Sequence, residues 1–278
     1  YIKRIYNIVM KEEYIIFETV GVTKSDNVSI CIINDLSNEL KDYIRNIFVN
    51  ICQGDRINIS FEYKSVLKDF IERINKNSNK LKNDEHLKGI VGELLSHALI
   101  RYELNNIKPV SVLFNLEEKS FKKGFDIIFI EKNNLELWFA EIKSGSLLEE
   151  GNNSQDKNKK LLHKAKNSIN NKFNDIEKSC WTNAISHASR INDSKDALNL
   201  LCNLYNEKDN IDNSKNVILS AVVYNDINDK INFDNTEKEK NKIEAKKEFN
   251  KIIVFSIQKN TYMKVIDFLK SELDKENE

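Results

Sequence analysis

Residues 125–131 (F-D-I-I-F-I-E) and 135–143 (L-E-L-W-F-A-E-I-K) predict two β-strands joined by a tight turn. Both segments are rich in Ile, Phe, Leu and Trp, which favour strands. An Asn-Asn pair at 133–134 separates them, and asparagine tolerates the positive φ that a short hairpin turn requires. A two-residue loop at this pair fixes the register, so that Asp126 faces Glu141 across the hairpin.

This register gathers three charged side chains at one end of an otherwise apolar surface. Asp126 and Glu141 are directly opposed, and the two-residue period of a strand adds Lys143 to the same face. Two carboxylates side by side repel each other unless a cation lies between them. Carboxylate oxygens suit a hard divalent cation such as Mg²⁺ or Mn²⁺, which keeps positions open for water and phosphate. We therefore predict a metal site that hydrolyses a phosphodiester, with Lys143 either orienting the nucleophile or offsetting developing negative charge.

The Glu-x-Lys tripeptide is weak evidence when taken alone, because 31% of the residues are charged. An acid two residues before a lysine also occurs in apparently helical or loop contexts at Glu39, Glu62, Glu117, Asp193 and Glu244. The alternative interpretation is a sheet edge whose charges are simply solvated. The strand context and the opposed Asp126 favour a functional role, because charged residues rarely end two otherwise buried strands without one.

The segment 84–104 predicts a long helix, because its apolar side chains recur with helical spacing. Glu93 lies just off the edge of the apolar face, where it either reaches toward a neighbouring sheet or remains solvated. Gly89 and Gly92 favour close packing against another backbone, although each costs about 1 kcal/mol in helix propensity.

The rest of the chain predicts further strands and helices with no clear linker. Strands are expected at 14–22, 27–33, 109–115, 216–224 and 252–257, and helices at 35–51, 63–74, 156–173, 181–205, 236–249 and 260–273. We expect a domain at 81–278, preceded by a mixed α+β extension at 1–80 that serves for packing or partner docking. The helix at 156–173 carries lysines that either contact a DNA backbone or are solvated: Lys157, Lys159, Lys160, Lys164, Lys166 and Lys172.

Composition gives little direct indication of function. The formal net charge is zero, so no overall basic character points to nucleic acid. The four cysteines are widely spaced, which favours reduced thiols over a zinc site or a disulfide framework. No apolar run is long enough to span a bilayer and no secretory leader is visible, so a cytoplasmic protein without membrane contact is expected.

Asp126 followed by Glu141-Ile142-Lys143 resembles the core of the PD-(D/E)xK nuclease superfamily. The order of one helix and three strands from residue 84 also resembles that core. The implied fold class is α/β, with a restriction-endonuclease-like mixed central sheet flanked by helices and a mixed N-terminal extension. The resemblance implies catalytic roles for Asp126, Glu141, Lys143 and Glu93. It implies metal ligation by Asp126, Glu141, Glu93 and the carbonyl of Ile142.

Three motifs narrow the resemblance: G-I-V-G-E at 89–93, G-F-D at 124–126 and L-W-F-A-E-I-K-S at 137–144. Over residues 82–268 the chain is similar to the HamA family of the Hachiman anti-phage system. Phe125 replaces the proline that gives the nuclease superfamily its name. The HamA resemblance implies a metal-dependent DNase effector restrained by HamB, a superfamily-2 helicase that releases it upon detecting invading or damaged DNA.

Three functions therefore remain in competition. The first is the helicase-restrained nuclease effector. The second is a stand-alone DNA enzyme with the same core, such as a restriction endonuclease or a junction resolvase. The third is a non-catalytic interaction module in which the charged cluster only holds a sheet edge.

Overall fold

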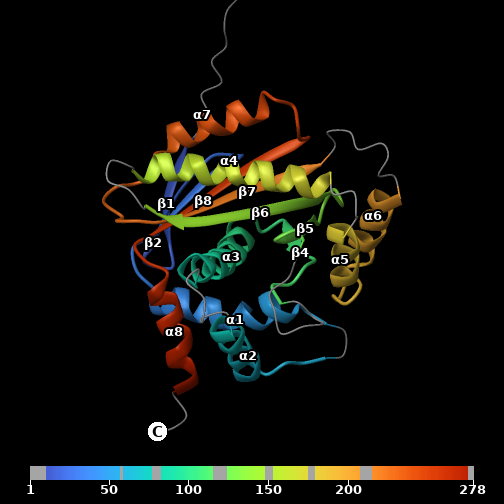
Figure 1. Cartoon of the computed structure of the whole chain (residues 1–278), viewed down its shortest axis with the longest axis horizontal. Helices are drawn as coiled ribbons and strands as arrows, with labels where there is room; N and C mark the ends of the chain where they lie inside the picture. Colours follow the sequence, from blue (N-terminus) through green and yellow to red (C-terminus); the bar gives the residue numbers. More distant parts are fainter. Residues whose placement is uncertain are drawn as a thin grey trace, which may run out of the picture.

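The computed structural model describes residues 11–56, 59–76, 83–114, 124–147, 153–174, 179–206 and 215–274. Its strands are β1 (Glu12–Ile16), β2 (Val20–Lys24), β3 (Val28–Ile33), β4 (Ile107–Pro109), β5 (Ile127–Glu131), β6 (Leu137–Ser146), β7 (Asn216–Tyr224) and β8 (Lys251–Lys259). Its helices are α1 (Asn38–Gln53), α2 (Tyr63–Lys76), α3 (Asn83–Glu103), α4 (Ser154–Phe173), α5 (Ser179–Ala188), α6 (Lys195–Asn206), α7 (Phe233–Glu244) and α8 (Met263–Asp274). The expected α/β class, a mixed central sheet flanked by helices, is confirmed (Figure 1).

Within the described residues, eight strands form one sheet in the order β1-β2-β3-β8-β7-β6-β5-β4. The four central strands, β3, β8, β7 and β6, are parallel, whereas both ends of the sheet are antiparallel. β7 is buried along its whole length, as its continuous apolar sequence requires of a strand covered on both faces. The prediction that two late strands extend the sheet beside the hairpin is confirmed.

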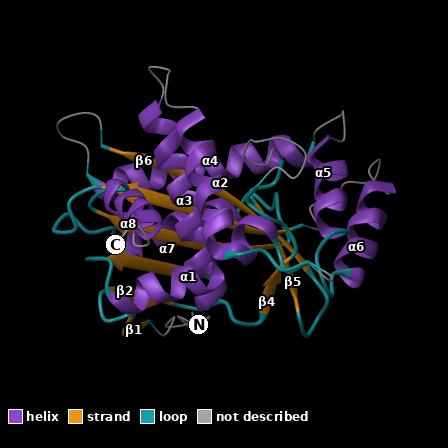
Figure 2. Ribbon diagram, turned by 90° about the horizontal axis from the view of Figure 1, so that it is seen from below, coloured by secondary structure: helices purple, strands orange, loops and turns teal. Residues whose placement is uncertain are grey.

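Helices cover the two faces of the sheet and enclose two hydrophobic cores. One core lies between the sheet and α1, α2, α3 and α8, and the other lies between the sheet and α4, α5, α6 and α7 (Figure 1). α5 and α6 pack together at the end of the sheet that holds β4 and β5, as the view from below also shows (Figure 2). α3 and α4 therefore contact opposite faces of β6.

The hairpin of β5 and β6 has the predicted register. Ile128 pairs with Phe139, and both side chains belong to the core beneath α4. Continuing this register by one pair beyond the first residue of β5 places Asp126 opposite Glu141. Opposed residues share a face, so both carboxylates are directed toward α4.

The turn of this hairpin differs from the prediction. Residues 132–135 form a longer loop, closed by a 2.8 Å hydrogen bond from the N–H of Glu131 to the carbonyl of Glu136. The positive φ falls on Leu135, at 54°, and not on an asparagine of the 133–134 pair. The loop closes on residues that the predicted register already paired, so the error leaves the register unchanged.

Several other element boundaries also require correction. The strand expected at 14–22 is a hairpin of β1 and β2, and the helix expected at 181–205 is interrupted to give α5 and α6. The strand expected at 109–115 is replaced by the short β4, which ends at Pro109. Residues 113 and 114 instead donate backbone hydrogen bonds to the last turn of α1. α4 begins earlier than predicted, because Asn153 caps it in place of Asp156.

The N-terminal strands are continuous with the central sheet. β3 pairs with β8 over six residues, from Val28↔Val254 to Ile33↔Lys259. The hydrogen-bonded sheet therefore crosses the boundary expected between residues 80 and 81, and the domain division remains a prediction. No helix in the described ranges is long and apolar enough to cross a membrane.

Candidate active site

Glu141 is the most deeply buried charged group at the predicted site, with 0% exposure. Its Oε1 accepts hydrogen bonds from Ser168 and from the ammonium of Lys143, both at 2.6 Å. Its Oε2 accepts a hydrogen bond from Lys172 at 2.5 Å. Burial raises the pKa of Glu141, and the charge of Asp126 raises it further, while Lys172 and Lys143 act in the opposite direction.

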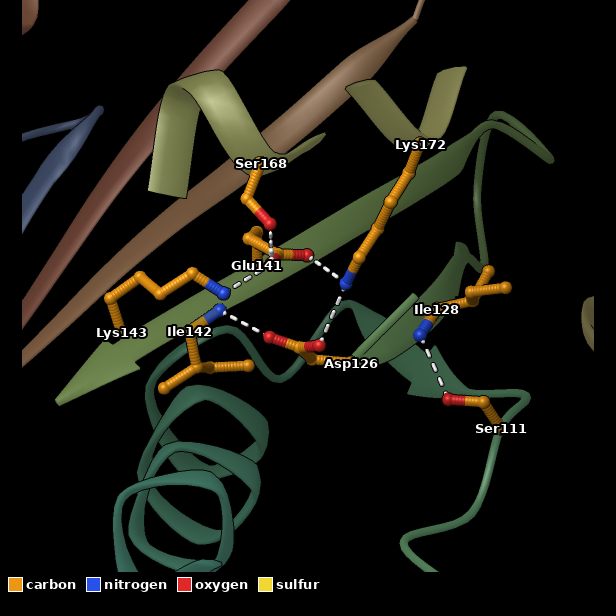
Figure 3. A network of polar contacts seen from close by, with 8 residues as sticks. All are labelled: Ser111, Asp126, Ile128, Glu141, Ile142, Lys143, Ser168 and Lys172. Carbon is orange, nitrogen blue, oxygen red and sulfur yellow. Dashed lines mark hydrogen bonds and ion pairs between the residues drawn. The ribbon is translucent and has the colours of Figure 1, made fainter. Parts of the chain in front are cut away.

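Asp126 lies just before β5 and is held from two directions. Its Oδ2 accepts the backbone N–H of Ile142 at 2.7 Å, and its Oδ1 accepts a hydrogen bond from Lys172 at 2.9 Å. β6 extends past the start of β5, so the Asp126 carboxylate bonds to β6 backbone that β5 does not pair. The aspartate therefore ends the β5–β6 ladder with its carboxylate beside Glu141 (Figure 3).

Sequence reasoning missed two residues of the site, both of them on α4. The sequence places Lys172 among lysines that either contact a DNA backbone or are solvated, but its side chain is directed inward and its ammonium lies between Asp126 and Glu141 (Figure 3). Ser168 lies one helical turn earlier and bonds to Glu141. A signal was available, since position 172 is only three residues beyond the buried Ile169 and next to a buried phenylalanine.

Lys172 is fully compatible with a charged state in this position. Burial lowers the pKa of its ammonium, but the attraction of Asp126 and Glu141 outweighs burial and raises the pKa above the ordinary value for lysine. Its side chain is 18% exposed and that of Asp126 is 13% exposed. The charges of this cluster balance, because the ammonium groups of Lys143 and Lys172 face two carboxylates.

The other two predicted ligands have different positions. Ile142 donates its N–H to Asp126, and in an extended strand the carbonyl of a residue points to the same edge as its N–H. Its carbonyl is thus directed to the Asp126 side. Glu93 is half-buried on α3, which packs on the opposite face of β6 from Glu141. In the described part of the chain, no three or more His, Cys, Asp and Glu side chains form a group able to hold a metal. Glu93 therefore forms no such group with Asp126 and Glu141 in the described residues, and its role remains a prediction.

Aromatic rings form the apolar wall beside these charges. Phe125 contacts Phe139 and Trp181, with ring centroids 4.9 and 5.2 Å apart, and Phe139 contacts Phe173 at 5.3 Å. Three of these rings immediately neighbour the site in sequence: Phe125 precedes Asp126, Phe139 lies two residues before Glu141, and Phe173 follows Lys172. Phe125 thus helps to fix the polar groups by packing.

The donor groups fit a divalent cation in kind and in direction. Lys172 is a stand-in cation, because its single ammonium attracts one oxygen from each of Asp126 and Glu141. Two carboxylates and a strand carbonyl are oxygen ligands, the kind that Mg²⁺ and Mn²⁺ prefer. A metal at this point would take the place of the ammonium.

The fold and site define a class of protein: an α/β protein whose mixed sheet, covered on both faces, carries an acid pair and two lysines where β5 and β6 diverge. The chain belongs to the HamA family, whose family model matches residues 9–273. Membership places it in the Hachiman anti-phage defence system. Neither the curated proteins nor the solved structures gave a match.

Proposed function

We propose that this protein is a metal-dependent DNA nuclease, the effector of a bacterial anti-phage system, held in check by a superfamily-2 helicase with which it works. One observation carries the proposal: the carboxylates of Asp126, just before β5, and of Glu141, on β6, converge on one cation beside Lys143. Membership in the HamA family supports the defensive context.

Each residue has a definite chemical task in this proposal. Asp126, Glu141 and the carbonyl of Ile142 would hold Mg²⁺ or Mn²⁺, and a bound ion would supply Lewis-acid chemistry toward a phosphodiester and its attacking water. Lys143 places a positive charge beside the carboxylates, where it offsets negative charge that develops on the phosphoryl group. Ser168 holds Glu141 in one orientation through its 2.6 Å hydrogen bond.

Positive charge farther along β6, on the face that carries the acid pair, supports DNA as the substrate. Gly145 lies on the same face of β6 as Glu141, and a Cβ placed on this glycine would come within 3.0 Å of the Lys157 ammonium. Burial and the neighbouring charge of Lys164 lower the pKa of Lys157, although Glu85 opposes them. Lys157 and Lys164 make no ion pair within the described residues, so their charges are available to phosphates.

Supercoiled plasmid tests the proposal. We expect nicking or degradation by the wild-type chain with Mg²⁺ and none with EDTA, and the Glu141→Ala/Lys143→Ala variant should be inactive. Glu136→Ala/Lys251→Ala is the matched control, because it removes another Glu–Lys ion pair, of 2.6 Å, from the surface. Each reaction is run with and without the helicase, which should change both the rate and its dependence on DNA state.

The charge balance of the site favours a second candidate, the non-catalytic interaction module. In that case Lys172 and Lys143 simply neutralise the acid pair and hold α4 against the sheet. The module predicts no Mg²⁺-dependent cleavage under any condition and no loss of defence in the Glu141→Ala/Lys143→Ala variant. Mg²⁺-dependent cleavage that needs no helicase and follows an intrinsic DNA preference would instead indicate a stand-alone nuclease.

A further inference from the structure

The position of Lys172 has a consequence for how a metal reaches this site. Its ammonium lies 2.9 Å from Asp126 Oδ1 and 2.5 Å from Glu141 Oε2, so it occupies the place between the two carboxylates that a bound metal requires. The charges of the cluster are already balanced by Lys172 and Lys143. A divalent ion added to this arrangement would face an ammonium at close range, and like charges in a poorly hydrated site repel strongly.

Packing restricts which part of the protein is able to yield. The first half of α4 is fixed to β8 and α7, because the buried Asn158 accepts a hydrogen bond from Ser256 at 2.9 Å and donates one to Thr236 at 3.1 Å. The last turn is fixed by Phe173, which stacks on Trp181 with ring centroids 6.1 Å apart. Because both parts of the helix are held, the flexible four-carbon side chain of Lys172 is the part that moves.

We infer that Lys172 is a resident cation that competes with the divalent metal for Asp126 and Glu141, so that the metal binds only when this lysine withdraws. The inference rests on the proposed metal site and adds to it a resting state without metal. In that state Lys172 stabilises the buried acid pair and keeps the site inactive. Withdrawal of the side chain exposes the carboxylates and leaves a positive charge at the edge of the site.

Calorimetric titration with Mn²⁺ tests this competition without DNA and without any activity measurement. The full chain is compared with Lys172→Met and with Lys166→Met. Lys166 is the matched control because it is a buried lysine of the same helix whose 2.8 Å partner is Glu248, away from the acid pair. We expect Lys172→Met to bind Mn²⁺ roughly tenfold or more tightly than wild type, since a charge repulsion is removed. Lys166→Met should bind like wild type.

Thermal melting gives an independent readout. Without metal, Lys172→Met should melt at a lower temperature than wild type, because its buried carboxylates have lost a counter-charge, and Mn²⁺ should restore the loss. Asp126→Asn in the Lys172→Met background should abolish both the tight binding and the restoration. If Lys172→Met does not fold, Lys172→Gln is used, which retains hydrogen-bond donors without the charge.

The inference is overturned if the position 172 variants bind Mn²⁺ no more tightly than wild type. An equal gain in affinity in Lys166→Met overturns it as well. The plasmid assay separates this failure from failure of the nuclease proposal. Mg²⁺-dependent cleavage by wild type without tighter binding in Lys172→Met refutes the competition alone. Tighter binding without cleavage by any variant refutes the nuclease and leaves the competition intact.

Discussion

At the scale of single residues, the site depends on how each buried charge is compensated. Glu141 is fully buried. Transfer of a charged carboxylate from water to a buried position costs free energy unless hydrogen bonds and counter-charges replace the water. Three donors, Ser168, Lys143 and Lys172, provide this replacement. Each therefore contributes to stability as well as to any chemistry, and the two effects are separable by measurement.

Ser168→Ala removes only the neutral donor. We expect a loss of about 1–3 kcal/mol in the free energy of unfolding, because hydrogen bonds to charged groups are worth more than neutral ones. Urea denaturation measures it, with Ser189→Ala as the control, since Ser189 is exposed and bonds only to a backbone carbonyl. Equal stability of Ser168→Ala and wild type would show that the bond does not hold Glu141.

Lys259, at the end of β8, predicts a pH dependence unrelated to the acid pair. It is 1% exposed, and burial lowers its pKa from 10.5 to about 8, although Asp35 opposes the shift. The unfolded chain binds more protons between these two values, so the free energy of unfolding should rise with pH across that window. Below pH 8 the charged lysine costs the fold about 3 kcal/mol at most.

Lys259→Met removes this cost. The variant should be more stable than wild type at pH 7, and the difference should shrink as the pH rises from 8 toward 10. Urea denaturation at four pH values measures the trend, with Lys242→Met as the exposed control, since Lys242 pairs with Glu239 and does not act on Lys259. A difference in stability that stays constant across this range would contradict a depressed pKa.

At the scale of elements, α3 and α4 hold opposite faces of β6, and α3 approaches the strand closely at one of its two glycines. On α3 the glycine is Gly92, where a Cβ would lie 2.8 Å from Ser144 Cβ and 3.1 Å from its Oγ. Nothing lies within 4 Å of a Cβ at Gly89, although the sequence predicted close packing at both. Helical periodicity does not distinguish these positions, because the contact depends on where the strand crosses the helix.

The two glycines give a matched pair with opposite expected signs. Gly92→Ala should destabilise the protein by about 1–3 kcal/mol, because α3 must shift away from β6. Gly89→Ala should stabilise it by up to about 1 kcal/mol through helix propensity. Chemical denaturation of both variants tests this, and equal effects of the two substitutions would contradict the close approach of α3 to Ser144.

The lysines of α4 differ in their partners. Lys166 and Lys172 pair with acidic side chains of the protein, whereas Lys157 makes no ion pair within the described residues. For Lys157→Ala we expect weaker DNA binding and a salt dependence reduced by about 0.9 in log–log slope, the value for one lost phosphate contact. Lys159→Ala is the control, because Lys159 lies 3.6 Å from Glu239. Fluorescence anisotropy across a salt series measures both. Identical slopes for the two variants would place the DNA elsewhere.

The comparison of α4 with the hairpin shows what sequence alone determines. The register of β5 and β6 was predictable because the period of two and the apolar pattern admit one alignment that buries Ile128 with Phe139. The direction of Lys172 was not, because a lysine beside an apolar stripe either snorkels to water or pairs with an acid on another element. Only the three-dimensional crossing of α4 over β6 decides between these outcomes.

At the scale of the whole molecule, the N-terminal strands complete both cores. Val28 and Ile30 of β3 belong to the core under α4, while Cys31 and Ile33 belong to the core under α3. α1 and α2 contribute to the latter core as well. Removing residues 1–80 would therefore expose the edge of β8 and a broad apolar surface on each side of the sheet.

The fragment 81–278 tests whether the extension is separable. We expect it to aggregate or to lose cooperative unfolding, because β8 forms a six-residue parallel ladder with β3 that no other described strand replaces. Thermal melting by circular dichroism and gel filtration measure this, with a chain beginning at residue 9, where the family match begins, as the control. A monomeric fragment with one sharp transition would establish 81–278 as an independent domain. In that case residues 1–80 would be free to serve mainly in partner docking. A fragment that fails to fold would instead show that β1–β3 belong to the scaffold that positions the acid pair.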